Sequence, residues 1–254
     1  MSAASAFNLD GRTVLVTGAN TGIGQGICLA IGRAGGAVIG VGRSSMEDTA
    51  QKMQAIGASF EAVSCDLGDH KAAQAMLDAA WEKAGTIDGI VNNAGIIRRA
   101  DAVDFTEEDW DDVMDVNLKS LFFMSQSYAR KLFVANMPGR IVNIASMLSF
   151  QGGIRVASYT ASKHGVLGIT RLLACEWAAK NINVNAIAPG YIETNNTEAL
   201  RNDPDRSSAI LGRIPAGRWG EASDIGDAAV FLLAPASGYV HGAVLPVDGG
   251  WLAR

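Results

Sequence analysis

The segment Thr13-Val14-Leu15-Val16-Thr17-Gly18-Ala19-Asn20-Thr21-Gly22-Ile23-Gly24 decides the fold of this chain. Its first five residues are β-branched or apolar and predict a buried strand over 13–17. Three glycines follow at the spacing Gly-x-x-x-Gly-x-Gly, and a helical pattern then runs over 22–33. A strand, a glycine-rich turn and a helix in this order are typical of the first unit of a dinucleotide-binding fold.

Each glycine of this turn has its own physical use. Gly18 permits the tight turn out of the strand, Gly22 lets the backbone approach a pyrophosphate, and Gly24 allows the helix to pack closely on the sheet. The helix N-terminus offers free N–H groups and a partial positive charge to phosphates. A plain strand-to-helix turn is the alternative interpretation of the glycines alone. The turn residues that we expect at a cofactor are Gly18, Asn20, Thr21, Gly22, Ile23 and Gly24.

The alternation of strand and helix continues along the chain. Near-continuous apolar strands between helices predict a parallel sheet covered on both faces. We therefore expect an α/β fold, a single Rossmann-type domain over residues 1–254 with a doubly wound parallel sheet of about seven strands. The carboxyl ends of the strands then share one edge, where ligands bind. Further strands are predicted at 37–41, 59–64, 87–92, 140–145, 183–188 and 243–247, and helices at 46–56, 71–83, 107–136, 158–180 and 223–233.

Composition argues against several classes of protein. The net charge is −5 and no basic stripe is present, so we expect no binding to nucleic acid or to an anionic membrane. No apolar run approaches the ~18 residues of a membrane span, and the first residues show no signal-peptide pattern. The three cysteines and three histidines are scattered, so we expect no disulfide framework and no metal site. These features together favour a cytoplasmic protein with reduced cysteines.

Two further strand ends favour a dinucleotide. An acidic side chain at Asp66 can accept a hydrogen bond from an adenine amino group. The alternative role is a helix N-cap, which suits Asp69 better. Small and amide residues that close the strand over 87–92 can hold backbone against the adenosine side of a cofactor. The residues expected there are Asp66, Leu67, Asn93, Ala94 and Gly95.

A group of polar residues points to acid–base chemistry. Tyr159 and Lys163 are four residues apart on a predicted helix and therefore share one face. Ser146 directly follows the predicted strand over 140–145, and Asn117 lies in the helix predicted before it. A phenol can donate a proton to a carbonyl oxygen, although its ordinary pKa of ~10 is high. A nearby ammonium favours the phenolate, and a serine hydroxyl can polarise the carbonyl. A tyrosine and lysine pair alone is more often a surface helix pair.

Jointly these motifs resemble the short-chain dehydrogenase/reductase family over essentially the whole chain. The resemblance implies a nicotinamide-dependent oxidoreductase in which Tyr159 is the acid/base and Lys163 supports it. It also implies that Asn117 holds a water that links the lysine to solvent. The implied catalytic residues are Asn117, Ser146, Tyr159 and Lys163.

The resemblance extends to the segment after the sixth predicted strand. In the family this loop meets the nicotinamide carboxamide, and the next segment resembles a substrate lid around residues 191–215. Family members are commonly homotetramers that associate through the two long helices, here predicted at 107–136 and 158–180. The further cofactor residues implied are Pro189, Gly190, Ile192 and Thr194, together with Tyr159 and Lys163.

The end of the second strand bears on the choice of nicotinamide cofactor. An acid at this position reads a ribose 2′-hydroxyl, but the chain has Gly42 there and Arg43 next. Arg43 can pair with a 2′-phosphate, which favours NADP over NAD. The glycine turn lacks the basic residue that many NADP-dependent enzymes carry, so use of NAD and dual use stay open.

Four stretches, 96–99, 145–155, 190–197 and 248–254, are similar to a subgroup of the family that acts on deoxy sugar acids. The similarity implies reversible oxidation of a secondary alcohol on such a small molecule. The carboxylate and hydroxyls of a sugar acid require an arginine and amides in the pocket. Arg98 and Arg99 can equally be surface charges. The residues expected to contact substrate are Ser146, Tyr159, Arg99, Gln151, Arg155 and Asn195.

Two alternatives have to be weighed against this hypothesis. A 3-oxoacyl-thioester reductase shares the fold and the catalytic residues, but it needs a site for a long acyl chain, which the arginines and amides disfavour. A regulator that binds cofactor without catalysis typically lacks the tyrosine or the lysine, and this chain has both.

Overall fold

The computed structural model describes residues 6–254. All strands of its sheet are parallel, in the order β3-β2-β1-β4-β5-β6-β7, which confirms the predicted doubly wound sheet. The chain crosses from β3 at one edge to β4 beside β1, so the winding direction reverses between β1 and β4. The strands are β1 (Thr13–Thr17), β2 (Ala37–Gly42), β3 (Phe60–Ser64), β4 (Gly89–Asn92), β5 (Gly139–Ile144), β6 (Ile182–Pro189) and β7 (Val244–Val247).

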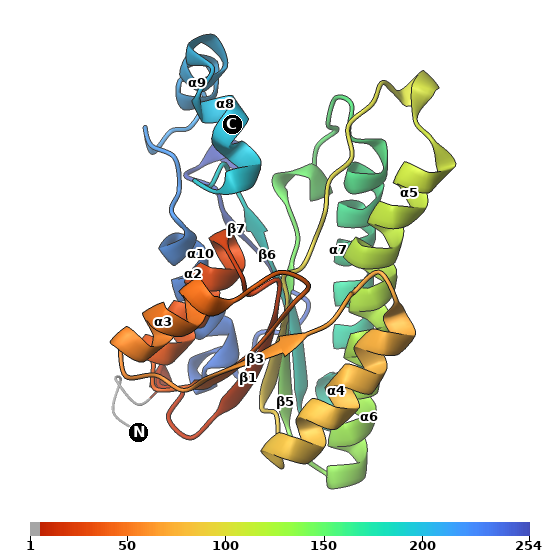
Figure 1. Cartoon of the computed structure of the whole chain (residues 1–254), viewed down its shortest axis with the longest axis vertical. Helices are drawn as coiled ribbons and strands as arrows, with labels where there is room; N and C mark the ends of the chain where they lie inside the picture. The colour runs from red at the N-terminus through yellow and green to blue at the C-terminus, as the bar shows by residue number, and fades with distance from the viewer. Residues whose placement is uncertain (1–5) are drawn as a thin grey trace.

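Helices cover both faces of the sheet (Figure 1). Helices α2, α3 and α10 pack together on one face, and α4, α5, α6 and α7 pack together on the other. Each layer encloses its own apolar core, because the strands are buried from both sides. The helices are α2 (Gly22–Arg33), α3 (Glu47–Ala55), α4 (His70–Ala84), α5 (Glu107–Met114), α6 (Leu121–Ala135), α7 (Ala157–Trp177) and α10 (Ala222–Leu233).

Strand register brings the predicted functional segments to one edge. Val16 of β1 pairs with Val91 of β4, and Asn92 pairs with Asn143 of β5. Ile144 pairs with Ile187 of β6, so these strands end at nearly the same level. The glycine turn, the loops after β4 and β5, and the loop after β6 therefore face one another across this edge.

The helix predicted over 107–136 is present from Glu107 to Ala135, but its middle is π-helical. α5 ends at Met114, a π-helical turn spans Asp115–Ser120, and α6 begins at Leu121. A π-helical turn has i→i+5 hydrogen bonds within an otherwise helical backbone, and the sequence analysis did not predict it. Asn117 lies inside this turn.

The segment that we call the lid, residues 195–211, stands beyond the carboxyl edge of the sheet (Figure 1). It consists of a 3-10 turn (Asn195–Thr197), α8 (Glu198–Arg201) and α9 (Pro204–Leu211). Neither α8 nor α9 contains a buried residue, so little packing holds the middle of the lid in place.

Across the 249 residues from 6 to 254, no helix combines the length and apolar character needed to cross a membrane.

Candidate active site

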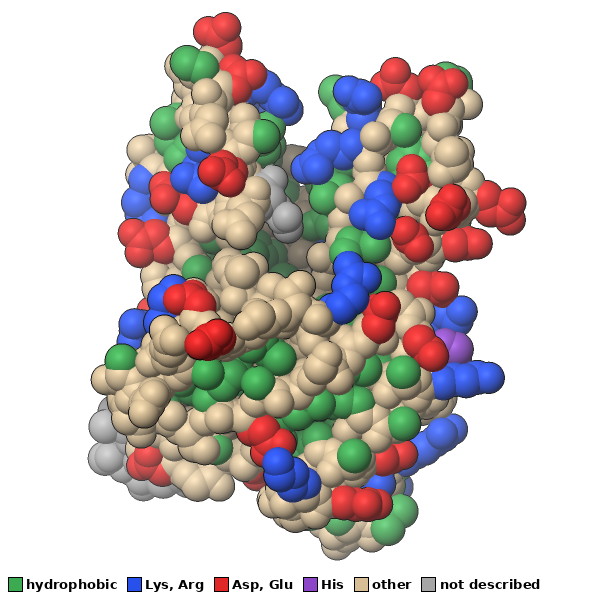
Figure 2. Space-filling view, viewed as in Figure 1, with side chains coloured by type: hydrophobic (Ala, Val, Ile, Leu, Met, Phe, Trp, Pro, Cys, Tyr) green, Lys and Arg blue, Asp and Glu red, His purple; other side chains and the backbone are tan. Residues whose placement is uncertain are grey.

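A cleft of about 760 Å³ lies at the carboxyl edge of the sheet. Figure 2 shows the molecule hollowed between the arm formed by α8 and α9 and the arm that carries α5 and α7. Every residue predicted to bind cofactor lines this cleft, from the glycine turn to Thr194. Of the predicted catalytic residues, Ser146, Tyr159 and Lys163 line it, and Asn117 does not. The tertiary structure therefore brings the loops after β1 to β6 and one face of α7 together at one site.

The glycine turn has the backbone geometry that a phosphate site requires. Gly18 has a φ of +67°, which favours glycine. A Cβ added to Gly24 would lie 2.0 Å from the carbonyl oxygen of Gly18, so a side chain there would push the turn apart. Thr21 makes no side-chain capping bond to α2, and the first N–H groups of that helix remain available to an anion. These features fit the pyrophosphate of a dinucleotide.

Asn93 and Thr17 hold the turn against the loop after β4. Asn93 Nδ2 donates to the carbonyl oxygens of Thr17 (2.8 Å) and Gly18 (3.2 Å). The hydroxyl of Thr17 accepts from the backbone N–H groups of Asn93 (2.9 Å) and Ala94 (3.0 Å). The amide of Asn93 thus shapes the cofactor turn. Sequence reasoning did not assign a role to Thr17, whose hydroxyl could only be placed once β1 and β4 were paired.

Tyr159 and Ser146 are the pair of hydroxyl-bearing side chains predicted to take part in proton transfer. Both side chains line the cleft. Burial raises the pKa of Tyr159 above its ordinary value, whereas the neighbouring Ser146 hydroxyl and the positive charge of Arg99 act in the opposite direction. Ser146 Oγ accepts from the backbone N–H of Leu148 at 3.1 Å, which orients the hydroxyl.

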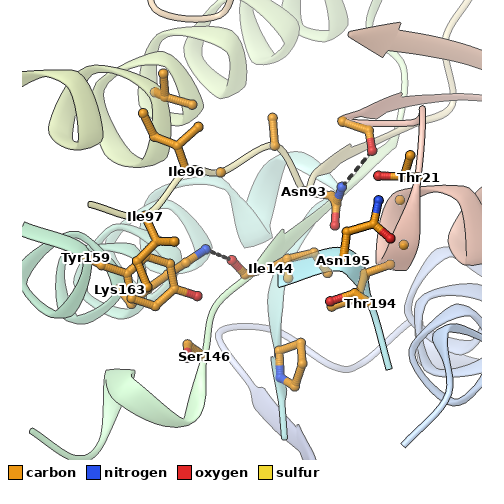
Figure 3. A pocket seen from close by; sticks show the side chains of 18 of the residues that line it. Thr21, Asn93, Ile96, Ile97, Ile144, Ser146, Tyr159, Lys163, Thr194 and Asn195 are labelled. Atoms are coloured by element: carbon orange, nitrogen blue, oxygen red, sulfur yellow. Dashed lines mark hydrogen bonds between the residues drawn. The ribbon is translucent and has the colours of Figure 1, made fainter. Parts of the chain in front are cut away.

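A backbone carbonyl at the end of β5 holds the Lys163 side chain in place. Its Nζ donates to the carbonyl oxygen of Ile144 at 2.6 Å, as Figure 3 shows. The residue is only 4% exposed, and burial lowers the pKa of the ammonium to about 8. Nζ lies 5.6 Å from the centre of the Tyr159 ring. The lysine is therefore held beside the phenol with a proton that it can release near neutral pH.

Asn117 acts on the cleft through its neighbour. Its Oδ1 accepts from the backbone N–H of Ile96 (2.8 Å), and its Nδ2 donates to the Ile96 carbonyl (2.9 Å). Nδ2 also lies 3.3 Å from Ser162 Oγ. The carboxamide is thus occupied by protein groups, and it fixes Ile96, which lines the cleft.

Two residues predicted to contact substrate lie elsewhere. Gln151 Oε1 accepts from Trp251 Nε1 at 3.1 Å, and Arg155 Nε pairs with Asp101 Oδ1 at 3.1 Å. Neither Gln151 nor Arg155 lines the cleft. The loop turns away after Ser146 through a 3-10 helix (Met147–Ser149), and closeness in sequence does not reveal that turn.

The other two residues predicted for substrate, Arg99 and Asn195, do line the cleft. Arg98 also lines it, but its guanidinium pairs with Asp109 (3.2 Å) and Asp112 (2.9 Å) on α5. Basic side chains gather on the wall of the cleft beside α5 (Figure 2). Within residues 6–254, Arg99 makes no ion pair with a carboxylate.

The adenosine end of the cleft carries the features that bear on cofactor choice. The Arg43 side chain is 75% exposed and lies 3.8 Å from the Asp66 carboxylate, a long and weak ion pair. Asp69 caps α4, so Asp66 is not needed there. A Cβ on Gly42 would have only ordinary contacts, the nearest at 3.6 Å, so glycine leaves open space beside Arg43.

A parallel sheet whose glycine turn fits a dinucleotide, with a serine, tyrosine and lysine at the same edge, defines a Rossmann-fold oxidoreductase. A family model described as enoyl-(acyl carrier protein) reductase matches residues 18–252. The chain belongs to the short-chain dehydrogenase/reductase family.

Several similar proteins in this family are named as sugar-acid dehydrogenases. The chain is 55% identical over 248 residues to the 2-dehydro-3-deoxy-D-gluconate 5-dehydrogenase of Dickeya dadantii strain 3937, covering 98% of each chain. It is also 55% identical over 250 residues to the protein of that name from Escherichia coli K12, covering 98% and 99%. A crystal structure of a putative 2-deoxy-D-gluconate 3-dehydrogenase from Agrobacterium tumefaciens with bound NADP is 59% identical, with a TM-score of 0.94 and coverage of 98% and 99%.

Proposed function

We propose that this protein is an NADP-dependent dehydrogenase of a deoxy sugar acid, of the 2-dehydro-3-deoxy-D-gluconate 5-dehydrogenase type. One observation carries the proposal: Arg99, which pairs with no carboxylate among residues 6–254, lines the same cleft as Tyr159 and Ser146. A carboxylate-bearing alcohol can thus bind with its charge at Arg99 and its hydroxyl at Tyr159. The full-length similarity to two sugar-acid dehydrogenases supports the same substrate class.

The residues of the cleft divide the chemistry between them. The nicotinamide cofactor, when bound, accepts or supplies the hydride. In the direction of oxidation, the Tyr159 phenolate removes the proton from the substrate hydroxyl. Ser146 donates a hydrogen bond to the developing carbonyl oxygen. Lys163 favours the charged form of the phenol and passes the proton towards solvent. Because the Asn117 carboxamide is occupied by Ile96, a water in this relay would bind the backbone of the π-helical turn.

The direct test is a panel of uronate-derived keto acids and their alcohols, each assayed with NADH and NADPH. We expect turnover of 2-dehydro-3-deoxy-D-gluconate or a close relative, with preference for NADP. An acetoacetyl thioester in the same panel tests the alternative 3-oxoacyl reductase. Higher kcat/KM for the thioester than for every sugar acid would refute the proposed substrate class.

Arg99→Ala is expected to raise KM for a sugar acid by about 10- to 100-fold, because hydrogen bonds to charged groups contribute roughly 1.5–3 kcal/mol. KM for a neutral ketone of similar size should change by less than about threefold, since no carboxylate is involved. Arg98→Ala is the matched control, because its guanidinium is already paired with two carboxylates. Equal effects of Arg99→Ala on both substrates would remove Arg99 from carboxylate binding.

Arg43→Ala is expected to raise KM for NADP by about tenfold, because a charge-assisted pair with the 2′-phosphate is lost. KM for NAD should stay within about twofold, because the substitution removes no group that binds the ribose 2′-hydroxyl. Gly42→Asp is the complementary variant: the space beside Gly42 admits a side chain, and a carboxylate there repels the 2′-phosphate. A preference for NADP that survives both substitutions would show that neither position reads the phosphate.

We propose that residues 191–215 include a substrate lid over the single Rossmann-type domain, and that the protein assembles as a homotetramer. Exposed apolar side chains on α5, α6 and α7 support association through these helices, among them Trp110 (39% exposed), Val134 (91%) and Leu172 (48%). Light scattering of the purified protein measures the mass directly. A monomeric mass at micromolar concentration would exclude the tetramer.

We also propose that the protein is located in the cytoplasm. Cys28, Cys65 and Cys175 are all free thiols in the structure, and burial raises the pKa of Cys28 to about 12, so that thiol is unreactive. Free cysteines suit a reducing compartment. Fractionation of the source cells tests it, and recovery in another compartment would contradict it.

A further inference from the structure

Trp251 occupies a buried position at the base of the lid, outside the reactive group of the cleft. It is 6% exposed and forms a separate apolar cluster with Met147 and Ile214. Tyr191, Ile210 and Leu252 pack against this cluster. Met147 and Tyr191 also line the cleft, whereas Trp251 does not. The indole therefore supports two residues of the cleft wall from behind.

The residues that flank the lid at both ends contact this one indole. Before the lid, the Tyr191 ring lies 4.9 Å from the Trp251 ring at an interplanar angle of 63°. After the lid, the Arg213 guanidinium lies 4.0 Å from the ring centre, within cation–π distance. Ile214 follows directly in the same cluster. Ile210 of α9 also packs against the cluster, and neither α8 nor α9 contains a buried residue, so these contacts set the position of the lid.

A third segment meets the same ring. Trp251 Nε1 donates to Gln151 Oε1 at 3.1 Å, which ties it to the loop that begins at Ser146. The segment that carries Trp251 is itself anchored: the Asp248 carboxylate accepts from the backbone N–H groups of Gly250 (2.8 Å) and Leu252 (2.9 Å). The Arg254 guanidinium adds a bond to the carbonyl oxygen of Gly212, one residue beyond the lid, at 2.8 Å.

We propose that Trp251 is a positioning residue for the reaction: its ring holds both ends of the lid and the loop after Ser146 in a fixed relation. The substrate pocket is closed by the lid on one side and by the Ser146 loop on the other. Their separation therefore depends on the side chain between them. Loss of the indole loosens the lid and weakens substrate binding, while the cofactor turn stays intact on the other side of the cleft.

The test compares Trp251→Ala and Trp251→Phe with the wild-type enzyme. Trypsin cuts after Arg201 and Arg206 in the lid, so the rate of cleavage there reports lid opening. For Trp251→Ala we expect cleavage about tenfold faster and KM for the sugar acid about tenfold higher, with cofactor Kd within about twofold. Trp251→Phe keeps an aromatic ring beside Tyr191 and Arg213, so it should restore most of the protection while losing only the bond to Gln151.

The matched control is Trp81→Ala on α4, which removes a partly buried tryptophan from the core on the opposite side of the sheet. It should lower the stability without changing lid cleavage or KM. Should Trp251→Ala fail to fold, Arg213→Ala removes one lid contact and should give faster cleavage and a higher KM. Cleavage and KM within twofold of wild type in the folded variant would overturn the proposal.

The inference about Trp251 rests on the proposed function only because the KM measurement uses a sugar acid as substrate. Absence of turnover with every sugar acid in the wild-type enzyme would refute that function and leave the cleavage result standing. Unchanged lid cleavage in an enzyme that still oxidises a sugar acid would refute the role of Trp251 alone.

Discussion

Tyr159→Phe is expected to lower kcat by about 10²- to 10⁴-fold, the typical contribution of a positioned acid/base. The substitution removes one hydroxyl and leaves the ring that lies beside Lys163. Ser146 lines the same cleft and is unchanged in this variant, so the loss reports the hydroxyl of Tyr159 alone. Steady-state assays with the sugar acid and NADP measure the loss.

The control for this substitution is Tyr239→Phe, because that tyrosine is 99% exposed and lies outside the cleft. Cofactor Kd should stay within about twofold in both variants, since the glycine turn is untouched. A Tyr159→Phe enzyme that retains more than a tenth of the wild-type kcat would exclude the phenol as the proton-transfer group.

Lys163→Met is expected to lower kcat by about 10²- to 10³-fold, because it removes the positive charge that favours the phenolate. It also leaves the carbonyl oxygen of Ile144 without the donor that now bonds it at 2.6 Å. Lys83→Met is the matched control: that lysine forms an exposed ion pair with Glu61 at the end of α4. A similar loss of activity in Lys83→Met would show that the effect comes from removing a positive charge in general and not from the position of Lys163.

The pKa of Lys163, lowered to about 8 by burial, also predicts a pH dependence. Below pH 8 the side chain of the free enzyme carries its proton, and above pH 8 it becomes neutral. kcat/KM for ketone reduction should therefore fall as pH rises through about 8. This limb of the profile should be absent in Lys163→Met. If kcat/KM falls at the same pH in both enzymes, the titrating group is not Lys163.

Much of the site could be predicted because its residues follow strands at short range. A parallel sheet brings the ends of its strands to one edge, so Gly18, Asn93, Ser146 and Gly190 could be placed together before any contact was known. Tyr159 and Lys163 share a helix face for an equally local reason. The geometric roles of these residues follow from spacing, which is a property of the chain itself.

Other residues could not be placed, because their partners are distant in sequence. Arg98 and Arg99 are adjacent and both line the cleft, yet Arg98 pairs with two carboxylates of α5, whereas Arg99 has no such pair in the part of the chain that the structure describes. Arg155 pairs with Asp101, more than fifty residues earlier. The direction of an exposed side chain depends on which loop packs beside it, and no local pattern contains that information.

By itself the sequence determined the class of fold and the glycine turn and predicted the residues that we propose to transfer the proton, because periodicity and spacing act along the chain. Only the tertiary structure decided which of the paired arginines lines the cleft away from the α5 carboxylates, where the helix over 107–136 becomes π-helical around Asn117, and how Trp251 contacts the residues that flank the lid. These features depend on packing between segments far apart in sequence, and packing is set by the whole fold.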